Sequence, residues 1–247
     1  MPNAERPGSK SDDSAARVSL FPGARIKKPG LHFEKQAYAE GFRLVAGVDE
    51  VGRGCLAGPV VAAACILDPV KRLPKGLNDS KKLTPKLREE IAEKLKSVCV
   101  AYAIGQVEAD EIDEINILEA TKKAMRLAIQ GLGCGTDYLL IDAVRLKDID
   151  LPQMPIIRGD SISASIAAAS VLAKTYRDAL MVGYHGQFPS YGFDGHKGYA
   201  ASVHLDALRE HGPCRIHRMS FHGVVDEVPH SDAQPLLIDM LAEPALR

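Results

Sequence analysis

Acidic side chains follow three short apolar segments of this sequence. Asp49 and Glu50 follow LVAGV, Asp142 follows YLLI, and Asp160 follows PIIRG. Ligand sites of open α/β sheets form at strand ends, so neighbouring strands could bring the four carboxylates together. Clustered carboxylates repel one another without a cation, and all-oxygen ligands suit Mg²⁺ or Mn²⁺. The four residues therefore predict a catalytic divalent-metal site; the alternative is that each Asp only caps a turn or helix.

A glycine-rich segment directly follows the first acidic pair. Its residues GRGCLA, beginning at Gly52, Arg53 and Gly54, match the dinucleotide fingerprint G-x-G-x-x-A, which must open a helix. Gly58 and Pro59 instead lead into β-branched residues that indicate a strand, which disfavours a nicotinamide-dependent oxidoreductase. Glycines that flank an arginine leave the backbone open to a sugar-phosphate chain. A plain tight turn is the alternative interpretation.

Basic residues concentrate in one part of the chain. Residues 71–96 hold nine Lys and Arg against four acidic residues, although the whole chain has a net charge of −1. Lys81 and Lys82 lie at the centre of this segment, in LNDSKKL. Lys174 and Arg177 add cations on a later helix, on the side of the third acidic segment. We expect this surface to bind phosphates, against the alternative that it is only a solvated face.

The segment YGFDGHKGY (191–199) mixes aromatic and cationic residues between glycines. Such loops stack on sugars or bases while they neutralise phosphate. Tyr199 is expected to be exposed and to bind nucleic acid, whereas Tyr191 and Phe193 are expected in the core. The remaining histidines have no metal-ligand spacing, so none is assigned to a metal.

The pattern of apolar residues predicts the elements that would carry these groups. Three strand-like segments come first and suggest a hairpin or meander, and helices alternate with the later ones. The order predicts an α/β layer fold with a mixed sheet. Strands are expected at 44–49, 59–67, 98–107, 138–142 and 155–160, and helices after Thr84-Pro85 and at 116–130, 163–184 and 200–210.

Composition excludes several classes of protein. With 46% apolar residues the 247-residue chain can bury a full core, and its near-zero net charge excludes a non-specific nucleic-acid coat protein. The longest apolar run, VVAAACIL, is too short for a membrane helix. The five scattered cysteines contain no C-x-x-C pair, which favours a reduced compartment over a disulfide framework or zinc site.

The two ends differ from the centre. Residues 1–35 are rich in Pro, Gly, Ser and charge and are predicted to be a mobile leader without a signal peptide. Residues 36–222 are predicted to form the catalytic domain, and 223–247 a C-terminal appendage. We expect a cytoplasmic monomer that does not bind membranes.

From VAGVDEVGRG onward the sequence resembles ribonuclease HII, the bacterial type 2 ribonuclease H. The resemblance continues in order over about residues 33–222. It runs through LNDSKKL, EINILEAT, LLIDA, GDSISASIAAASVLAK, FPSYGFDGHKGY and HRMSF. Several blocks in one order are far more specific than any single motif. The resemblance implies a ribonuclease H-like mixed five-stranded sheet flanked by helices, with a small helical C-terminal part.

The resemblance also implies an activity and residue roles. The family's four metal-binding catalytic carboxylates fall on Asp49, Glu50, Asp142 and Asp160, and its junction-sensing tyrosine falls on Tyr199. Its glycine-arginine-glycine element, on residues 52–54, would contact the ribonucleotide.

Two Mg²⁺ or Mn²⁺ ions would then activate a water and stabilise the leaving 3′ oxygen. The expected partners are RNA–DNA hybrids and duplex DNA with single embedded ribonucleotides, cut on the 5′ side to leave 3′-hydroxyl and 5′-phosphate ends. A hybrid-binding protein without activity is the remaining alternative, and it would have no reason to keep all four carboxylates.

Two residues depart from the family pattern. Cys55 stands where the family usually has proline, and Ala201 where threonine is common.

Overall fold

A five-stranded mixed sheet forms the centre of the structure, a computed structural model that describes residues 28–225. The strand order is β3-β2-β1-β4-β5, in which β1, β2 and β3 pair antiparallel and β1, β4 and β5 pair parallel. This confirms the predicted meander and the mixed sheet. The strands are β1 (Val45–Val51), β2 (Val60–Leu67), β3 (Cys99–Val107), β4 (Tyr138–Asp142) and β5 (Gln153–Ile156).

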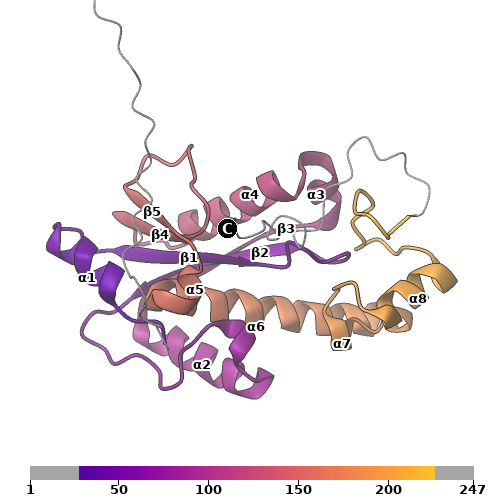
Figure 1. The fold of residues 1–247 in the computed structure, drawn as a ribbon, viewed down its shortest axis with the longest axis horizontal. Coiled ribbons are helices and arrows are strands. Elements are labelled where there is room, and N and C mark those ends of the chain that lie inside the picture. The colour runs from indigo at the N-terminus through magenta and orange to yellow at the C-terminus, as the bar shows by residue number, and fades with distance from the viewer. Residues whose placement is uncertain (1–27, 226–247) are drawn as a thin grey trace, which may run out of the picture.

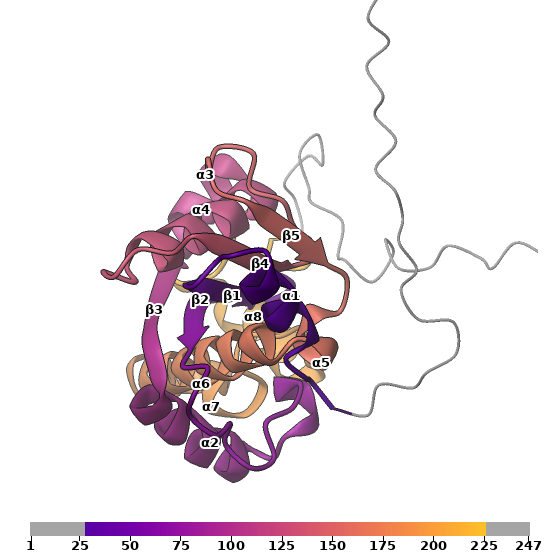
Figure 2. The ribbon, with the colours of Figure 1, turned by 90° about the vertical axis from the view of Figure 1, so that its left-hand side faces the viewer.

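Helices cover both faces of the sheet (Figure 1). One face packs on α4, and the other on α6 with α2 behind it, which Figure 2 shows from the end. The α-helices are α1 (His32–Ala39), α2 (Pro85–Val98), α3 (Ala109–Ile115), α4 (Ile117–Gln130), α5 (Gly159–Ile162), α6 (Ala164–Gln187), α7 (Phe193–His196) and α8 (Ser202–His211), and two 3₁₀ turns are η1 (Ser80–Lys82) and η2 (Pro189–Tyr191).

The interior strand β2 is buried on both faces, because its alternate side chains enter two different cores. Its neighbour β1 approaches α6 so closely at Gly47 that an added Cβ would lie 2.1 Å from the carbonyl carbon of Ser165. The alanine-rich start of α6 is fully buried against the sheet, as its composition predicts. This close packing fixes the position of β1 relative to α6.

Local signals explain the helices that the sequence predicted best. Thr84 caps α2 by accepting a hydrogen bond from the N–H of Leu87, and Pro85 occupies the first turn. Asn116 caps α4 in the same way, accepting from the N–H groups of Leu118 and Glu119. Tyr191 and Phe193 are buried and stacked, which confirms their expected place in the core.

Two predicted boundaries were wrong. The leader was expected to extend to residue 35, but α1 crosses that position, and Phe33 and Glu34 are buried. The Glu34 carboxylate accepts hydrogen bonds from Ser163 and Ser165 at the start of α6, so this helix belongs to the domain. At the other end Val224 is buried in the main core, beyond the expected limit at 222. The predicted leader up to residue 27 and the appendage from residue 226 lie outside the described residues.

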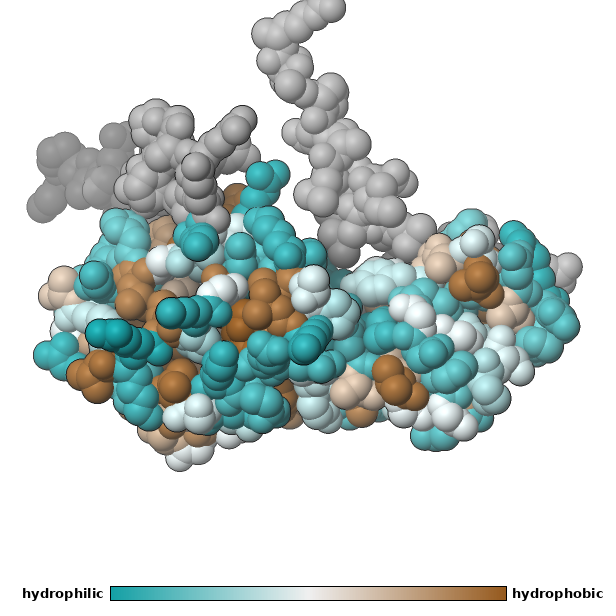
Figure 3. Space-filling view, turned by 90° about the horizontal axis from the view of Figure 1, so that it is seen from below, coloured by the Kyte–Doolittle hydropathy of each residue, from teal (hydrophilic) through white to brown (hydrophobic). Residues whose placement is uncertain are grey.

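The surface of the helical face below the sheet is predominantly hydrophilic, with separate hydrophobic patches (Figure 3). Within residues 28–225 no helix is both long and apolar enough to span a membrane.

Candidate active site

The four predicted carboxylates lie on three elements that the sheet topology brings together. Asp49 and Glu50 belong to β1, and Asp142 ends β4, the parallel neighbour of β1. Asp160 was expected directly after a strand, but β5 stops at Ile156 and Asp160 lies in the first turn of α5. The Asp142 carboxylate joins these elements, because its Oδ1 accepts a 2.7 Å hydrogen bond from the N–H of Gly159.

The carboxylates influence one another electrostatically. Burial, followed by the charges of Glu50 and Asp142, raises the pKa of Asp49 well above its usual value. Burial also raises the pKa of Glu50, against the Arg53 guanidinium. The pKa of Asp142 rises to about 6 through burial and through the charges of Glu50 and Asp160. Bringing these groups together therefore costs free energy that a bound cation would recover.

Two cations of the protein partly offset this charge. Arg53 Nη1 lies 3.2 Å from Glu50 Oε1, and Lys81 Nζ lies 3.9 Å from Asp160 Oδ2. Although burial opposes the change, Asp160 and Asp49 raise the pKa of Lys81. Lys81, predicted to hold phosphate, thus lies directly beside the carboxylates.

The donor chemistry of the cluster fits a divalent ion. Every group is a carboxylate, and Glu50 Oε2 is buried without a hydrogen-bond partner among the residues that the structure describes. Within residues 28–225, no three Asp, Glu, His or Cys side chains form a metal-binding arrangement as they stand. Arg53 pairs with Glu50 Oε1 and Lys81 lies near Asp160 Oδ2, so the second oxygen of each of these carboxylates is not used by these cations.

The glycine-rich segment connects β1 to β2, and the two strands are antiparallel. Since the segment leads into a strand, it lacks the helix that a dinucleotide fingerprint needs, which excludes the oxidoreductase interpretation. In the described part of the chain, a Cβ added at Gly54 would meet no atom within 4 Å apart from its chain neighbours, whereas at Gly52 it would lie 2.2 Å from Arg177 Nε. The segment is therefore packed on its Gly52 side and open at Gly54.

Two fully buried arginines support this segment from behind. Arg218 donates to the carbonyl oxygens of Gly52, Arg53 and Gly58 at 2.7–3.0 Å. Arg177 donates to the carbonyls of Pro59, Ala57 and Lys197. Arg177 was expected among the cations of the phosphate-binding surface, but it is fully buried and its guanidinium is bound to carbonyls, so it is not part of that surface. Sequence reasoning missed both roles because a buried arginine that binds carbonyls leaves no local pattern.

Tyr199 is 41% exposed beside this segment. Burial of the phenol, followed by the neighbouring Cys55 thiol, raises the pKa of Tyr199 to about 12. Lys174 Nζ lies 5.6 Å from the centre of the ring and also pairs with Asp178 Oδ1 at 2.7 Å. Cys55, which departs from the family pattern, is thus a neighbour of the tyrosine.

Lys82 lies on η1 next to Lys81. Its Nζ is 3.3 Å from Asp79 Oδ2 and 3.4 Å from Ser161 Oγ, so η1 contacts the residue that follows Asp160. Its side chain is 57% exposed. The central lysines of the basic segment therefore lie at the edge of the carboxylate cluster.

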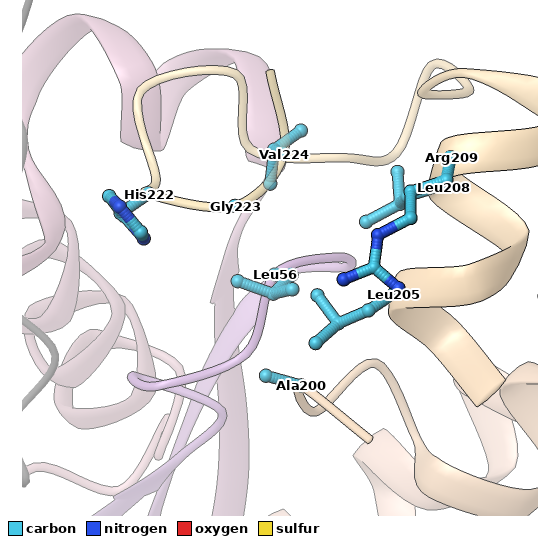
Figure 4. Close-up of a pocket in the computed structure, with 8 residues that line it drawn as sticks. All are labelled: Leu56, Ala200, Leu205, Leu208, Arg209, His222, Gly223 and Val224. Carbon is cyan, nitrogen blue, oxygen red and sulfur yellow. The ribbon is translucent and has the colours of Figure 1, made fainter. Parts of the chain in front are cut away.

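A pocket of about 530 Å³ lies beside Tyr199 and is lined by Lys174, Lys197 and Arg88 among others. A second pocket, of about 290 Å³, lies between α8 and the loop at Gly223, where Leu56, Leu205 and Val224 meet (Figure 4). Neither pocket is lined by one of the four carboxylates, and the first contains Tyr199 and Lys174 in its wall.

Comparisons with known proteins agree with these features. The family model described as Ribonuclease HII matches residues 46–224. Ribonuclease HII of Chlamydia caviae is 58% identical over 190 residues, which cover 76% of this chain and 89% of that protein. Ribonuclease HII of Syntrophotalea carbinolica is 49% identical over 207 residues, 84% of this chain and 98% of that protein.

The fold has solved relatives as well. The crystal structure of the ribonuclease H2 from Pyrococcus horikoshii OT3 superposes with a TM-score of 0.63 at 26% identity, over 74% of this chain and 95% of that one. The family model covers most of the described residues, and the carboxylates of β1, β4 and α5 all fall within it. The chain therefore belongs to the ribonuclease HII family and is an endonuclease of the ribonuclease H type.

Proposed function

We propose that this enzyme hydrolyses RNA in RNA–DNA hybrids and cuts duplex DNA on the 5′ side of a single embedded ribonucleotide, leaving 3′-hydroxyl and 5′-phosphate ends. The observation that carries the proposal is that the glycine segment directly follows the acidic pair of β1. The segment begins at Gly52, one residue after the strand, is open at Gly54, and is linked to the acidic pair by the Arg53–Glu50 ion pair. A sugar-phosphate backbone lying on this segment would present its phosphate to the carboxylates.

Asp49, Glu50, Asp142 and Asp160 would hold divalent cations, Mg²⁺ or Mn²⁺, as catalytic ligands. Two bound ions would supply an activated water and stabilise the leaving 3′ oxygen. The raised pKa values of Asp49 and Asp142 support this role, since a cation would relieve the repulsion behind them. Gly159 orients the Asp142 carboxylate through the hydrogen bond from its N–H.

Selection of a ribonucleotide requires contact with a 2′-hydroxyl. Gly54 leaves room for a close approach of the substrate backbone, and the partly exposed Tyr199 ring can stack on the neighbouring sugar. Lys174 and the η1 lysines would hold flanking phosphates. In this interpretation Arg177 and Arg218 keep the glycine segment and the Tyr199 loop in register.

We further propose that the protein acts as a monomer in the cytoplasm. All five cysteines are free, as expected in a reducing compartment. Light scattering of the purified full chain tests the monomer.

The experiment that tests the function compares four labelled substrates with Mg²⁺ or Mn²⁺: an RNA–DNA hybrid, duplex DNA with one ribonucleotide, the same duplex without it, and single-stranded RNA. We expect cleavage of the first two only, with product ends mapped as above. Cleavage of the all-DNA duplex, or cuts on the 3′ side of the ribonucleotide, would refute the proposal. Replacement of Tyr199 by Ala is expected to slow cleavage at the single ribonucleotide more than cleavage of the hybrid, where further 2′-hydroxyls offer alternative registers.

A further inference from the structure

Two cysteines that the proposed function does not use lie on the neighbouring strands β2 and β3. Cys65 is in β2, and Cys99 is the first residue of the edge strand β3, directly after α2. Both pack into the core that α2 and α6 form on one face of the sheet. Neither residue is among the carboxylate, glycine or lysine groups described above.

A β-bulge places the two thiols on the same face. Cys65 pairs with Tyr102, but the register shifts at Ile66/Leu67, so that Leu67 pairs with Cys99. In an uninterrupted ladder Leu67 would face Val100, and Cys99 would point to the other face. The bulge therefore turns Cys99 toward the side of the sheet that Cys65 already occupies.

The environments of the two thiols differ. Cys65 is fully buried, whereas Cys99 is only partly buried. The neighbouring Cys65 thiol lowers the pKa of Cys99 to about 7 although burial opposes this, and the Lys71 ammonium acts in the same direction as Cys65. The neighbouring Cys99 thiol, followed by burial, raises the pKa of Cys65 well above its usual value. An accessible thiolate beside a shielded thiol is the arrangement of an attacking and a resolving cysteine.

We propose that Cys65 and Cys99 are a modification site that reacts with a low-molecular-weight disulfide to form a reversible intramolecular disulfide. The Cys99 thiolate attacks one sulfur of the small disulfide, whose S–S bond breaks and releases one small thiolate. The Cys65 thiol then loses its proton and attacks Cys99 sulfur, and the second small thiol leaves with that proton. Two protein thiols are thereby oxidised, and one small disulfide is reduced to two thiols.

A disulfide between Cys65 and Cys99 would constrain the chain between them. The covalent loop would enclose residues 66–98, which contain η1 with Lys81 and Lys82 as well as α2. Because β3 is an edge strand with a bulge at this point, it can shift toward Cys65 without breaking pairing on a second side. Oxidation would thus tie the segment that bears the substrate-facing lysines to the central sheet.

The test treats the full chain with oxidised glutathione at increasing dose until the exposed Cys134 carries an adduct, then alkylates free thiols and maps the peptides by mass spectrometry. We expect peptides with Cys65 and Cys99 joined by a disulfide in most chains, and their release by dithiothreitol. If both residues remain alkylated while Cys134 is modified, the proposal is overturned.

A variant separates the two steps. In Cys65→Ala the resolving thiol is missing, so the glutathione adduct should accumulate on Cys99, whereas the matched variant Cys214→Ala should still form the Cys65–Cys99 link. A wild-type protein that keeps a stable adduct on Cys99 would contradict resolution by Cys65. An unmodified Cys99 in the Cys65→Ala variant would contradict its role as the attacking thiol.

Discussion

Two glycines of the segment are expected to have different roles, Gly54 in substrate contact and Gly52 in folding. Gly54 has open space where a side chain would project, while Gly52 has φ +90° and packs against Arg177. We predict that Gly54→Ala keeps the melting temperature of the wild type but slows cleavage on the order of 10²-fold, because an added methyl displaces the scissile phosphate. Gly52→Ala should lower both stability and activity. An active Gly54→Ala enzyme would remove this glycine from the substrate path.

When no metal ion is bound, the negative charge of Asp142 should lower the free energy of unfolding. Its folded-state pKa of about 6 exceeds the usual 3.8, so the folded state holds the proton more tightly. The contribution of this group to stability is present below about pH 4, is lost as the pH rises through 6, and stays lost at neutral pH.

Asp142→Asn should therefore raise the melting temperature at neutral pH in a chelator, whereas added Mg²⁺ should stabilise the wild type and not the variant. Scanning fluorimetry measures both effects. Asp148→Asn, which removes a half-exposed partner of Arg126, is the matched control. A lower melting temperature of Asp142→Asn in chelator would oppose this interpretation of the cluster.

Among the elements, η1 should carry much of the phosphate binding. Replacing Lys81 and Lys82 together by Ala should weaken binding to all duplexes alike and reduce the slope of log K against log salt by about one to two units. The measurement is fluorescence anisotropy in chelator at several salt concentrations. Lys94→Ala with Lys96→Ala is the control pair, since Lys96 is bound to Glu93 on α2. Equal slopes for both double variants would make the η1 lysines a solvated surface.

Buried histidines connect α8 and the C-terminal segment to the Tyr199 loop. The N–H of Cys214 donates to His217 Nδ1 at 2.9 Å, and His217 Nε2 lies 3.0 Å from His204 Nε2. His204 Nδ1 in turn faces the carbonyl oxygen of Tyr199 at 2.8 Å. Burial and His204 lower the pKa of His217 to about 4.

A lowered histidine pKa means that the stability contribution is complete above about pH 6.5 and is lost as the pH falls toward 4. We predict that His217→Gln lowers stability at neutral pH and flattens the fall of the unfolding free energy between these values. His211→Gln, on an exposed position of α8, should leave the pH slope unchanged. Urea unfolding across the pH range measures the slopes, and identical slopes for wild type and His217→Gln would contradict the prediction.

An element could be predicted well when the residues that stabilise it are close to it in the sequence, and poorly when they are distant. The start of α2 was predictable because Thr84 and Pro85 act on their own backbone. Helix α1 was missed because Leu31 supplies no side-chain cap, and its anchor, Glu34, binds serines about 130 residues away. The end of β5 was misplaced because Ile157 looks like a strand residue but is 79% exposed, and Arg158 turns the chain with φ 56°.

At the scale of the whole molecule, the acidic residues could be selected from the sequence, but their grouping depends on strand order. Residues about 90 positions apart meet because β4 pairs with β1, and the hydrogen bond from Gly159 then joins α5 to Asp142. The supporting arginines, 177 and 218, were not predictable, because their partners are backbone carbonyls of two loops far from them in the sequence.

The grouping of the carboxylates makes Asp49 the residue to test, since it is the most enclosed of them and feels the other three. The measurement is the single-turnover rate on duplex DNA with one ribonucleotide, for wild type and Asp49→Asn, at saturating protein with Mg²⁺ or Mn²⁺. We predict that binding stays within about threefold while the cleavage rate falls at least ~100-fold, equivalent to about 2.7 kcal/mol of barrier. A variant that keeps more than about a tenth of the wild-type rate would show that the carboxylate cluster is not the catalytic centre.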